Sequence, residues 1–219
     1  MTTPVHPFPV RVAHQLLAPL GLDTQRFFTT YPLAAKLKRH ALKHLTTQQM
    51  ATLLRLSRQA HPVVITVHDI VPHLVRHDRE QRQYRHPVEA FFDKLAMSGL
   101  KRADRLIAIS ESTKKTLVEA LGCREETIDV VLYGVDHNIF RPVQVSAEFR
   151  ARYGIEENCR HVLSVGAESP RKNLPRLLGA FAQVRQERPD LILLKVGSPE
   201  YLPQARQLRA RIDALTTWK

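Results

Sequence analysis

Short apolar runs alternate with longer amphipathic segments along most of this chain, and this alternation constrains the fold more than any other feature. Each run is short and bounded by polar or turn residues, as expected for a buried strand of a parallel sheet. A chain that alternates strand and helix forms a parallel sheet with right-handed crossovers. The predicted strands are Pro62–Val67, Arg105–Ile109, Ile128–Leu132, His161–Val165 and Leu191–Val196.

The segments between these runs predict helices. Pro87 suits the first turn of one helix, and Gly122 is a natural carboxyl cap of the next. A break is expected at Thr46-Thr47 within a longer helical pattern, where a threonine hydroxyl can cap a new helix. The other expectations are a helical segment over 33–60, short helices over 147–153 and 203–215, a helix over Asn173–Glu187, and a short strand over 10–14.

A domain boundary is predicted near Pro142, after which a new series of helices and strands begins. We expect a first Rossmann-like domain over 1–141, a linker over 142–146 and a second Rossmann-like domain over 147–219. The second domain contains two predicted strands, fewer than an open sheet ordinarily needs. The predicted fold class is therefore α/β, with a Rossmann-like parallel-sheet domain followed by an incomplete second Rossmann-like domain.

The formal net charge of +12 is the unusual bulk property. Residues 1–110 contain 16 Lys/Arg and 7 Asp/Glu, a net charge of +9 that leaves +3 for the rest. A basic segment of this kind can bind nucleic acid, an anionic membrane or a phosphorylated substrate. No arginine-rich run or aromatic–basic alternation of a nucleic-acid module occurs, so no nucleic-acid partner is expected. The segment with Leu53, Leu54 and Leu56 among Arg55 and Arg58 predicts a basic surface helix, or alternatively a face for a membrane or anionic acceptor.

The sequence lacks the signatures of several classes of protein. No apolar run is long enough to cross a bilayer, the amino terminus lacks a secretion signal, and Cys123 and Cys159 suggest neither a disulfide framework nor a zinc site. These features predict a cytoplasmic protein. The dinucleotide, P-loop and nucleophile-elbow motifs are missing. His73 and His77 beside Asp78 raise a metal site as an alternative, but solvated histidines are the preferred interpretation.

A phosphate site is predicted where the fourth apolar run ends. The run closes on Gly166, a polar loop follows, and Arg171 and Lys172 stand at the start of an amphipathic helix. Ligands of open α/β sheets bind at the carboxyl ends of strands, and a helix amino terminus offers free N–H groups to an anion. Arginine and lysine supply complementary charge. The same strand-end rule selects His68 and Asp69.

Five motifs in order resemble those of the group 4 glycosyltransferases. They are Val-Ile-Thr-Val-His68-Asp69, Arg102-Ala-Asp104-Arg-Leu-Ile-Ala-Ile-Ser110-Glu111, Gly134-Val135-Asp136, Phe140-Arg-Pro142 and Val-Gly166-x3-Pro170-Arg171-Lys172-Asn173-Leu. The resemblance runs from about Val63 to Val196. It implies the two-domain GT-B fold and transfer of a sugar, as in a hexosyltransferase, from a nucleotide-sugar with retention of anomeric configuration.

The resemblance also assigns roles to residues. Arg171 and Lys172, with Gly166 in their loop, would bind the donor diphosphate and neutralise charge on the leaving phosphate. His68 would be the catalytic residue that faces the donor sugar, and no metal or other cofactor is implied. The remaining residues would line the cleft: Asp69, Ser110, Glu111, Gly134, Val135 and Asp136.

Three departures from the family pattern temper these expectations. Ala167 stands where many members have an arginine, the glycine-rich loop is not visible in residues 1–32, and the paired glutamates would lie beyond Lys219. We therefore expect a truncated member with weak or no activity alone. The alternative is a non-enzymatic binding or scaffold protein with a degenerate fold. The basic first half would suit a phosphorylated or lipid-linked acceptor and peripheral attachment at the inner face of the membrane.

Overall fold

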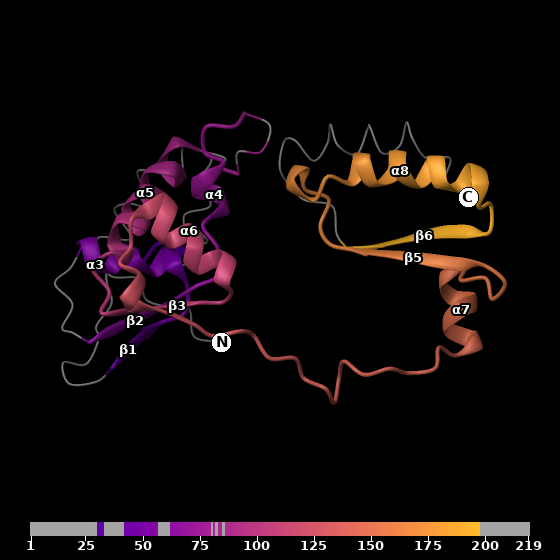
Figure 1. Cartoon of the computed structure of the whole chain (residues 1–219), viewed down its shortest axis with the longest axis horizontal. Coiled ribbons are helices and arrows are strands. Elements are labelled where there is room, and N and C mark those ends of the chain that lie inside the picture. The colour runs from indigo at the N-terminus through magenta and orange to yellow at the C-terminus, as the bar shows by residue number, and fades with distance from the viewer. Residues whose placement is uncertain are drawn as a thin grey trace, which may run out of the picture. The chain divides into compact units, whose positions relative to one another are not determined.

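The computed structural model describes residues 30–32, 42–56, 62–79, 81, 83–84 and 86–197. These residues fall into two compact units, and the chain passes from the first to the second between Gly134 and Val135 (Figure 1). Each unit is described by itself below. The strand predicted over 10–14 and the helix predicted over 203–215 lie outside the described residues.

The first unit is built on a four-stranded parallel sheet with the order β1-β2-β3-β4. Its strands are β1 (Lys43–Leu45), β2 (Val63–Val67), β3 (Arg105–Ala108) and β4 (Ile128–Val130). In β2 the side chains alternate between buried and half-buried, which places one of its faces in the core. The predicted strands of this unit are thus confirmed, although β3 and β4 end one and two residues before their predicted limits.

Helices connect the strands of this sheet. Because the strands follow one another in order and right-handed crossovers place their helices on the same face, α3, α5 and α6 lie together on one side (Figure 1). The helical elements are η2 (Gln48–Ala51), α3 (Thr52–Leu56), α4 (Val71–Leu74), α5 (Pro87–Leu100), α6 (Glu111–Leu121) and η3 (Glu125–Thr127). As predicted, Pro87 opens α5 and Gly122 caps α6 in the left-handed conformation, with φ of 64°.

In the described part of the helical segment predicted over 33–60, the prediction is confirmed from Gln48 to Leu56 and is wrong at Lys43–Leu45. Residues Lys43–Leu45 form β1, because pairing with Val63–Ile65 of β2 satisfies their backbone groups. A new helical element does begin after Thr47, but the Thr47 side chain makes no capping hydrogen bond. Leu53 and Leu54 are buried in the core and Arg55 is exposed, as expected for the basic amphipathic surface helix. The burial of these two leucines removes them from the alternative face for a membrane or anionic acceptor.

The core of the first unit lies between the sheet and its helices. Its largest fully buried side chains include Leu53 of α3, Ile65 of β2, Leu100 of α5, Leu106 of β3 and Leu117 of α6. Helix α5 approaches the η2–α3 segment so closely that a Cβ atom on Gly99 would lie 2.1 Å from the carbonyl oxygen of Ala51. The absence of a side chain at Gly99 therefore determines how near these two elements can pack.

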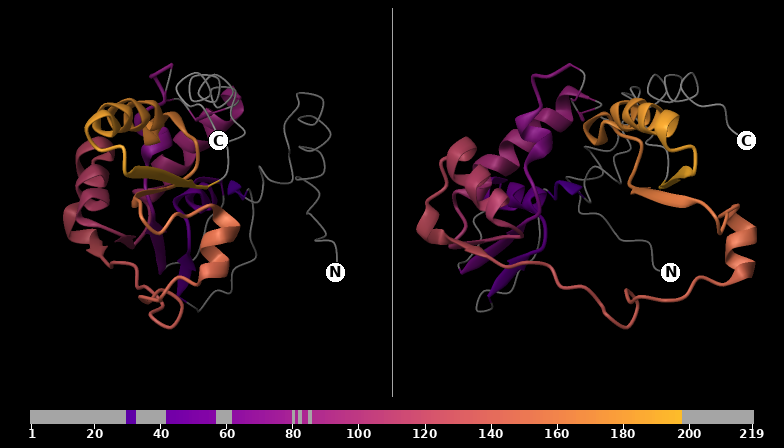
Figure 2. Two further views of the ribbon diagram at one scale, coloured as in Figure 1. Left: turned by 90° about the vertical axis from the view of Figure 1, so that its right-hand side faces the viewer. Right: turned by 45° about the vertical axis from the view of Figure 1, so that its right-hand side comes forward.

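The second unit contains a two-stranded parallel sheet of β5 (Arg160–Val165) and β6 (Leu191–Val196). It follows α7 (Ala147–Tyr153), whose amino end is capped by Ser146 and whose carboxyl end is closed by Gly154 with φ of 62°. Between the strands come η4 (Pro170–Lys172) and α8 (Leu174–Glu187). Helix α8 lies over one face of the sheet in all three views (Figures 1 and 2), with Leu174 buried among Leu177 and Leu178.

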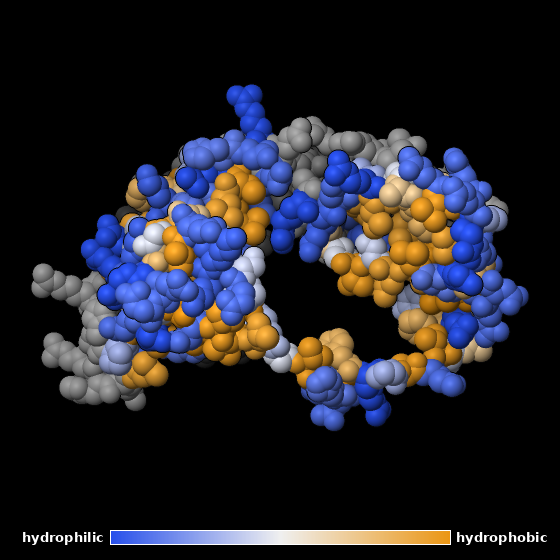
Figure 3. Space-filling view, viewed as in Figure 1, coloured by the Kyte–Doolittle hydropathy of each residue, from blue (hydrophilic) through white to orange (hydrophobic). Residues whose placement is uncertain are grey.

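The strands of the second unit leave much apolar surface uncovered. In β5, the side chains of Leu163 and Val165 are 62% and 69% exposed, and orange apolar atoms mark this unit and the segment that precedes it in Figure 3. A two-stranded sheet with one covering helix buries little surface, in line with the small second domain that the sequence predicts. Of the helices that the structure describes, none has both the length and the apolar character needed to cross a bilayer.

Candidate functional site

His68 lies directly after β2, at the carboxyl end of the sheet of the first unit. Its backbone is fixed on both sides: the N–H donates to Oε1 of Gln48 at 3.2 Å, and the carbonyl accepts from Oγ1 of Thr113 at 3.3 Å. Thr113 belongs to α6 and Gln48 to η2. Hydrogen bonds from two helical elements therefore hold the strand end that carries the histidine.

The His68 imidazole is also engaged at both ring nitrogens. Nε2 lies 2.9 Å from the carbonyl oxygen of Thr46, and Nδ1 is hydrogen bonded to the Tyr133 hydroxyl. The two rings are tilted by 36°, with 5.7 Å between their centroids. His68 is half-buried, so its ring lies at the surface of the sheet edge rather than in the core.

Ser110 and Glu111 stand at the start of α6, close to this histidine. The Ser110 hydroxyl accepts from the N–H of Thr113 at 3.1 Å, which makes Ser110 the amino cap of the helix. Ser110 Oγ also lies 3.0 Å from Oγ1 of Thr113, the hydroxyl that donates to the His68 carbonyl. Ser110 is thus connected to His68 through Thr113, whereas the exposed Glu111 side chain lies in the first turn of the helix.

The other strand-end residues of the prediction make local contacts. Asp69 accepts from the N–H of Val71 at 3.0 Å, and this bond shapes the entry to α4. Asp136 accepts from the N–H of Asn138 at 2.9 Å through its side chain and thereby closes a turn. Gly134 and Val135 are exposed, and a Cβ atom on Gly134 would meet nothing within 4 Å. The predicted role of these residues in lining a cleft stays a prediction.

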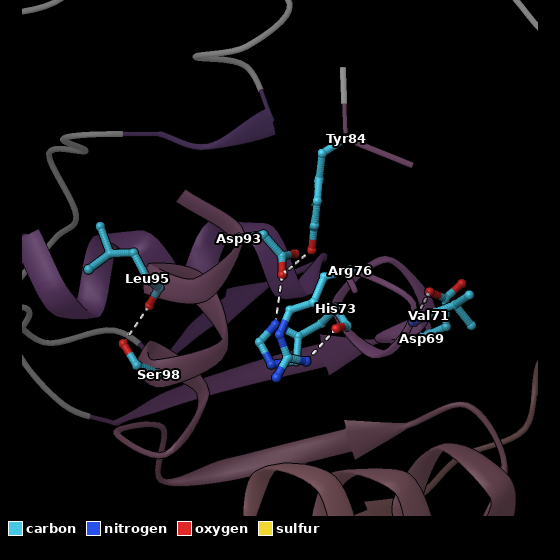
Figure 4. Close-up of polar contacts among 8 residues, drawn as sticks. All are labelled: Asp69, Val71, His73, Arg76, Tyr84, Asp93, Leu95 and Ser98. Atoms are coloured by element: carbon cyan, nitrogen blue, oxygen red, sulfur yellow. Dashed lines mark hydrogen bonds and ion pairs between the residues drawn. The ribbon is translucent and has the colours of Figure 1, made fainter. Parts of the chain in front are cut away.

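A polar cluster that the sequence did not reveal lies between α4 and α5. The Asp93 carboxylate, 3% exposed, accepts at Oδ2 from Nδ1 of His73 at 2.9 Å and from the Tyr84 hydroxyl at 2.6 Å (Figure 4). Burial, followed by the hydrogen bond to Asp93, raises the pKa of the Tyr84 phenol far above its ordinary value, so this hydroxyl keeps its proton and donates it. The His73 side chain, 12% exposed, is therefore a partner of Asp93, and its interpretation as a solvated histidine is wrong.

Replacement of Asp93 by alanine is expected to lower the free energy of unfolding of the first unit by about 2 kcal/mol, because it leaves two partly buried donors without their acceptor. Asp129→Ala is the matched control, since Asp129 also accepts hydrogen bonds from another side chain, that of Arg105, but both side chains of that pair are about half exposed. The control should cost less than about 1 kcal/mol. Urea denaturation measures both values, and equal losses would show that the Asp93 cluster does not hold α4 to α5.

The predicted phosphate-binding residues lie together in the second unit. Arg171 and Lys172 end the η4 turn, and both are exposed. The Lys172 side chain extends over Gly166, because a Cβ atom on that glycine would lie 3.8 Å from Cε of the lysine. Gly166 itself pairs with β6 through a 2.9 Å bond from its N–H to the Val196 carbonyl. The structure thus places Lys172 at the carboxyl end of β5, as the spacing predicts.

The start of α8 continues this arrangement. Asn173 occupies the capping position with φ of 51°, and its side chain makes no hydrogen bond to the first N–H groups of the helix. Asparagine is one of the few residues that tolerate this left-handed conformation. Pro175 has no N–H, and the N–H of Arg176 donates to the Asn173 carbonyl at 3.1 Å, so the helix dipole and the two neighbouring cations rather than free N–H groups attract anions here.

A buried ion pair lies behind the same loop. Nζ of Lys195 lies 3.3 Å from Oε1 of Glu168, and it donates to the carbonyl of Gly197 at 3.0 Å. Gly197 has φ of 138°, and a Cβ atom there would lie 2.1 Å from the Gly166 carbonyl oxygen. The carboxyl ends of β5 and β6 therefore approach each other through two glycines, of which the sequence prediction identified only Gly166. Within the described part of the chain, no three His, Cys, Asp or Glu residues are grouped so as to bind a metal ion.

The match to a known family covers nearly all of the first unit. The family model of Glycosyltransferase Family 4 matches residues 4–139, more than half of the chain. This range contains His68 and Ser110, both held by Thr113 of α6.

Curated relatives are named D-inositol 3-phosphate glycosyltransferase. The protein from Segniliparus rotundus is 32% identical over 123 residues, which are 53% of this chain and 27% of that protein. The protein from Thermobispora bispora is 38% identical over 101 residues, which are 44% of this chain and 23% of that protein. The matched segments thus span about a quarter of the length of these relatives.

Solved structures show the same fold. HepE from Anabaena in complex with UDP-glucose has a TM-score of 0.54 and 24% identity, with 80% of this chain and 45% of that chain covered. A trehalose-6-phosphate protein from E. coli bound with UDP-2-fluoro glucose has a TM-score of 0.59 and 12% identity, with 94% and 46% covered. These likenesses confirm the predicted α/β, GT-B-like fold class.

Proposed function

Because the chain belongs to Glycosyltransferase Family 4, we propose that it forms part of an enzyme that transfers a sugar from a nucleotide-sugar donor to an acceptor, with retention of anomeric configuration. The family match over 4–139, which includes His68 at the carboxyl end of β2, carries this proposal. Strand ends of this kind are where open α/β sheets bind their ligands.

The donor diphosphate is assigned to the second unit. Lys172 lies over Gly166, Arg171 stands beside it, and the amino end of α8 follows at once. When the bond between sugar and diphosphate breaks, negative charge grows on the leaving phosphate. Fixed cations near that charge lower the barrier, because they stabilise the transition state more than the bound donor. Relatives of this fold were solved with UDP and UDP-sugars, which makes these the first probes to use.

The acceptor is proposed to carry a phosphate group. The curated relatives are named for D-inositol 3-phosphate, and residues 1–110 carry a net charge of +9, which favours an anionic partner. A lipid-linked acceptor and attachment to an anionic membrane stay predictions. The burial of Leu53 and Leu54 removes the apolar face on which the membrane interpretation partly depended.

Calorimetric titration with UDP, UDP-glucose and glucose tests the donor proposal on the chain as it stands. We expect UDP and UDP-glucose to bind with a dissociation constant of about 1 mM or below, and free glucose to show no measurable binding, because the charged diphosphate supplies most of the attraction. ATP controls for non-specific attraction of phosphates to a basic protein. Equal binding of ATP and UDP-glucose, or no binding at all, would contradict the proposal and favour a protein that lacks donor recognition.

A further inference from the structure

Tyr133 lies at the end of the first unit and is hydrogen bonded to His68. The N–H of Val131 donates to the Ala108 carbonyl at 2.9 Å, so sheet pairing continues one residue beyond β4. Tyr133 follows two residues later, immediately before Gly134, where the first unit ends. Its ring is 61% exposed, yet its hydroxyl bonds to the His68 imidazole. The last aromatic residue of this unit therefore contacts the residue that the proposed function makes catalytic.

The hydrogen bonds of the His68 ring define its tautomer. A backbone carbonyl oxygen can only accept, so in the 2.9 Å contact with Thr46 the hydrogen is on Nε2. A neutral imidazole then has a lone pair on Nδ1, and the Tyr133 hydroxyl donates to it. A 180° flip of the ring would put Cδ2 in the place of Nδ1 and Cε1 in the place of Nε2, and would break both hydrogen bonds at once.

We propose that Tyr133 is a positioning residue for His68: with the Thr46 carbonyl it fixes the Nε2–H tautomer and the plane of the ring. This inference depends on the proposed function only for its catalytic meaning, because the geometry lies wholly within the first unit. Precise placement of a reacting group governs rate strongly. Since Tyr133 directly precedes Gly134, the bond also ties the chain segment that leaves this unit to the orientation of His68.

Nitrogen-15 NMR of the imidazole tests the inference without any substrate. The neutral ring is recognised in the spectra by one protonated and one unprotonated nitrogen. In the unmodified protein we expect a protonated Nε2 and an Nδ1 resonance shifted by its hydrogen bond. Tyr133→Phe removes only the hydroxyl, so Nδ1 should move toward the resonance of an unbonded nitrogen, while Nε2 stays protonated. His68→Gln identifies the resonances by their loss.

Tyr153→Phe is the matched control, since Tyr153 is an exposed tyrosine of the second unit that packs on Phe149. It should leave both His68 resonances unchanged. A protonated Nδ1 in the unmodified protein, or an Nδ1 resonance that does not move in Tyr133→Phe, would overturn the inference. UDP affinity should be unaltered by Tyr133→Phe, so a failed NMR test and a failed donor titration are separate results.

Discussion

Substitution of Gly99 by alanine is expected to lower the free energy of unfolding of the first unit by about 3 kcal/mol, near the upper end of ordinary overpacking costs. The new Cβ atom would lie 2.1 Å from the carbonyl oxygen and 2.8 Å from the carbonyl carbon of Ala51. Both are backbone atoms and cannot rotate away as a flexible side chain could. Helix α5 and the η2–α3 segment must therefore separate, which opens the core around Leu53 and Leu100.

Gly179→Ala is the matched control, because it makes the same change within helix α8. A Cβ atom there would meet nothing within 4 Å. Removal of the conformational freedom of glycine should then stabilise the helix by about 0.5–1 kcal/mol. Amide hydrogen exchange, measured separately for residues of each unit, distinguishes the two effects. A Gly99→Ala protein with unchanged exchange in α5 would show that the close approach to Ala51 is not required.

Charge reversal by Lys172→Glu is expected to weaken binding of UDP by about 100-fold. The change removes a charge-assisted hydrogen bond and places a like charge beside the diphosphate, and contacts with charged groups are worth about 1.5–3 kcal/mol. Lys172 already lies over Gly166 at the carboxyl end of β5, so the loss of UDP affinity does not require another helix or strand to move. Calorimetric titration with UDP measures the loss.

Arg185→Glu controls for the change in net charge. Arg185 is an exposed residue in the last turn of the same helix, α8. At 1.5 Å per residue it lies about 16 Å along the helix from Leu174, beyond the screening length of about 8 Å at physiological salt. UDP affinity should change by less than about twofold. If both variants lose affinity equally, the attraction comes from overall charge rather than from a site at Lys172.

The sequence was most informative where a strand is mostly β-branched or aliphatic. Val63–Val67 and Leu191–Val196 form strands within a residue of their predicted limits, because such runs suit a buried sheet. The segment Lys43–Leu45 gave no such signal. It is a strand only because its backbone pairs with β2, and no local pattern of three residues reports a partner 20 positions away.

The candidate site also contains residues that the sequence predicts and residues that it does not. The strand-end rule selected His68, Gly166 and Lys172 correctly as neighbours of sheet edges, because that rule depends on local order along the chain. It could not find the Thr46 carbonyl, since a backbone group has no residue type, nor Tyr133, which is 65 positions from His68. His73 was misread for the same reason: its buried partner Asp93 is 20 positions downstream.

Residue-resolved NMR during titration with UDP-glucose tests the donor assignment most directly. The spectrum of the 15N-labelled chain reports every described amide of both units. We expect the largest shifts at Gly166 and at residues 167–174, with Arg171, Lys172 and the first turn of α8 among them. Shifts confined to other segments of the chain, or none at a donor concentration where calorimetry detects binding, would contradict a diphosphate site at the carboxyl end of β5.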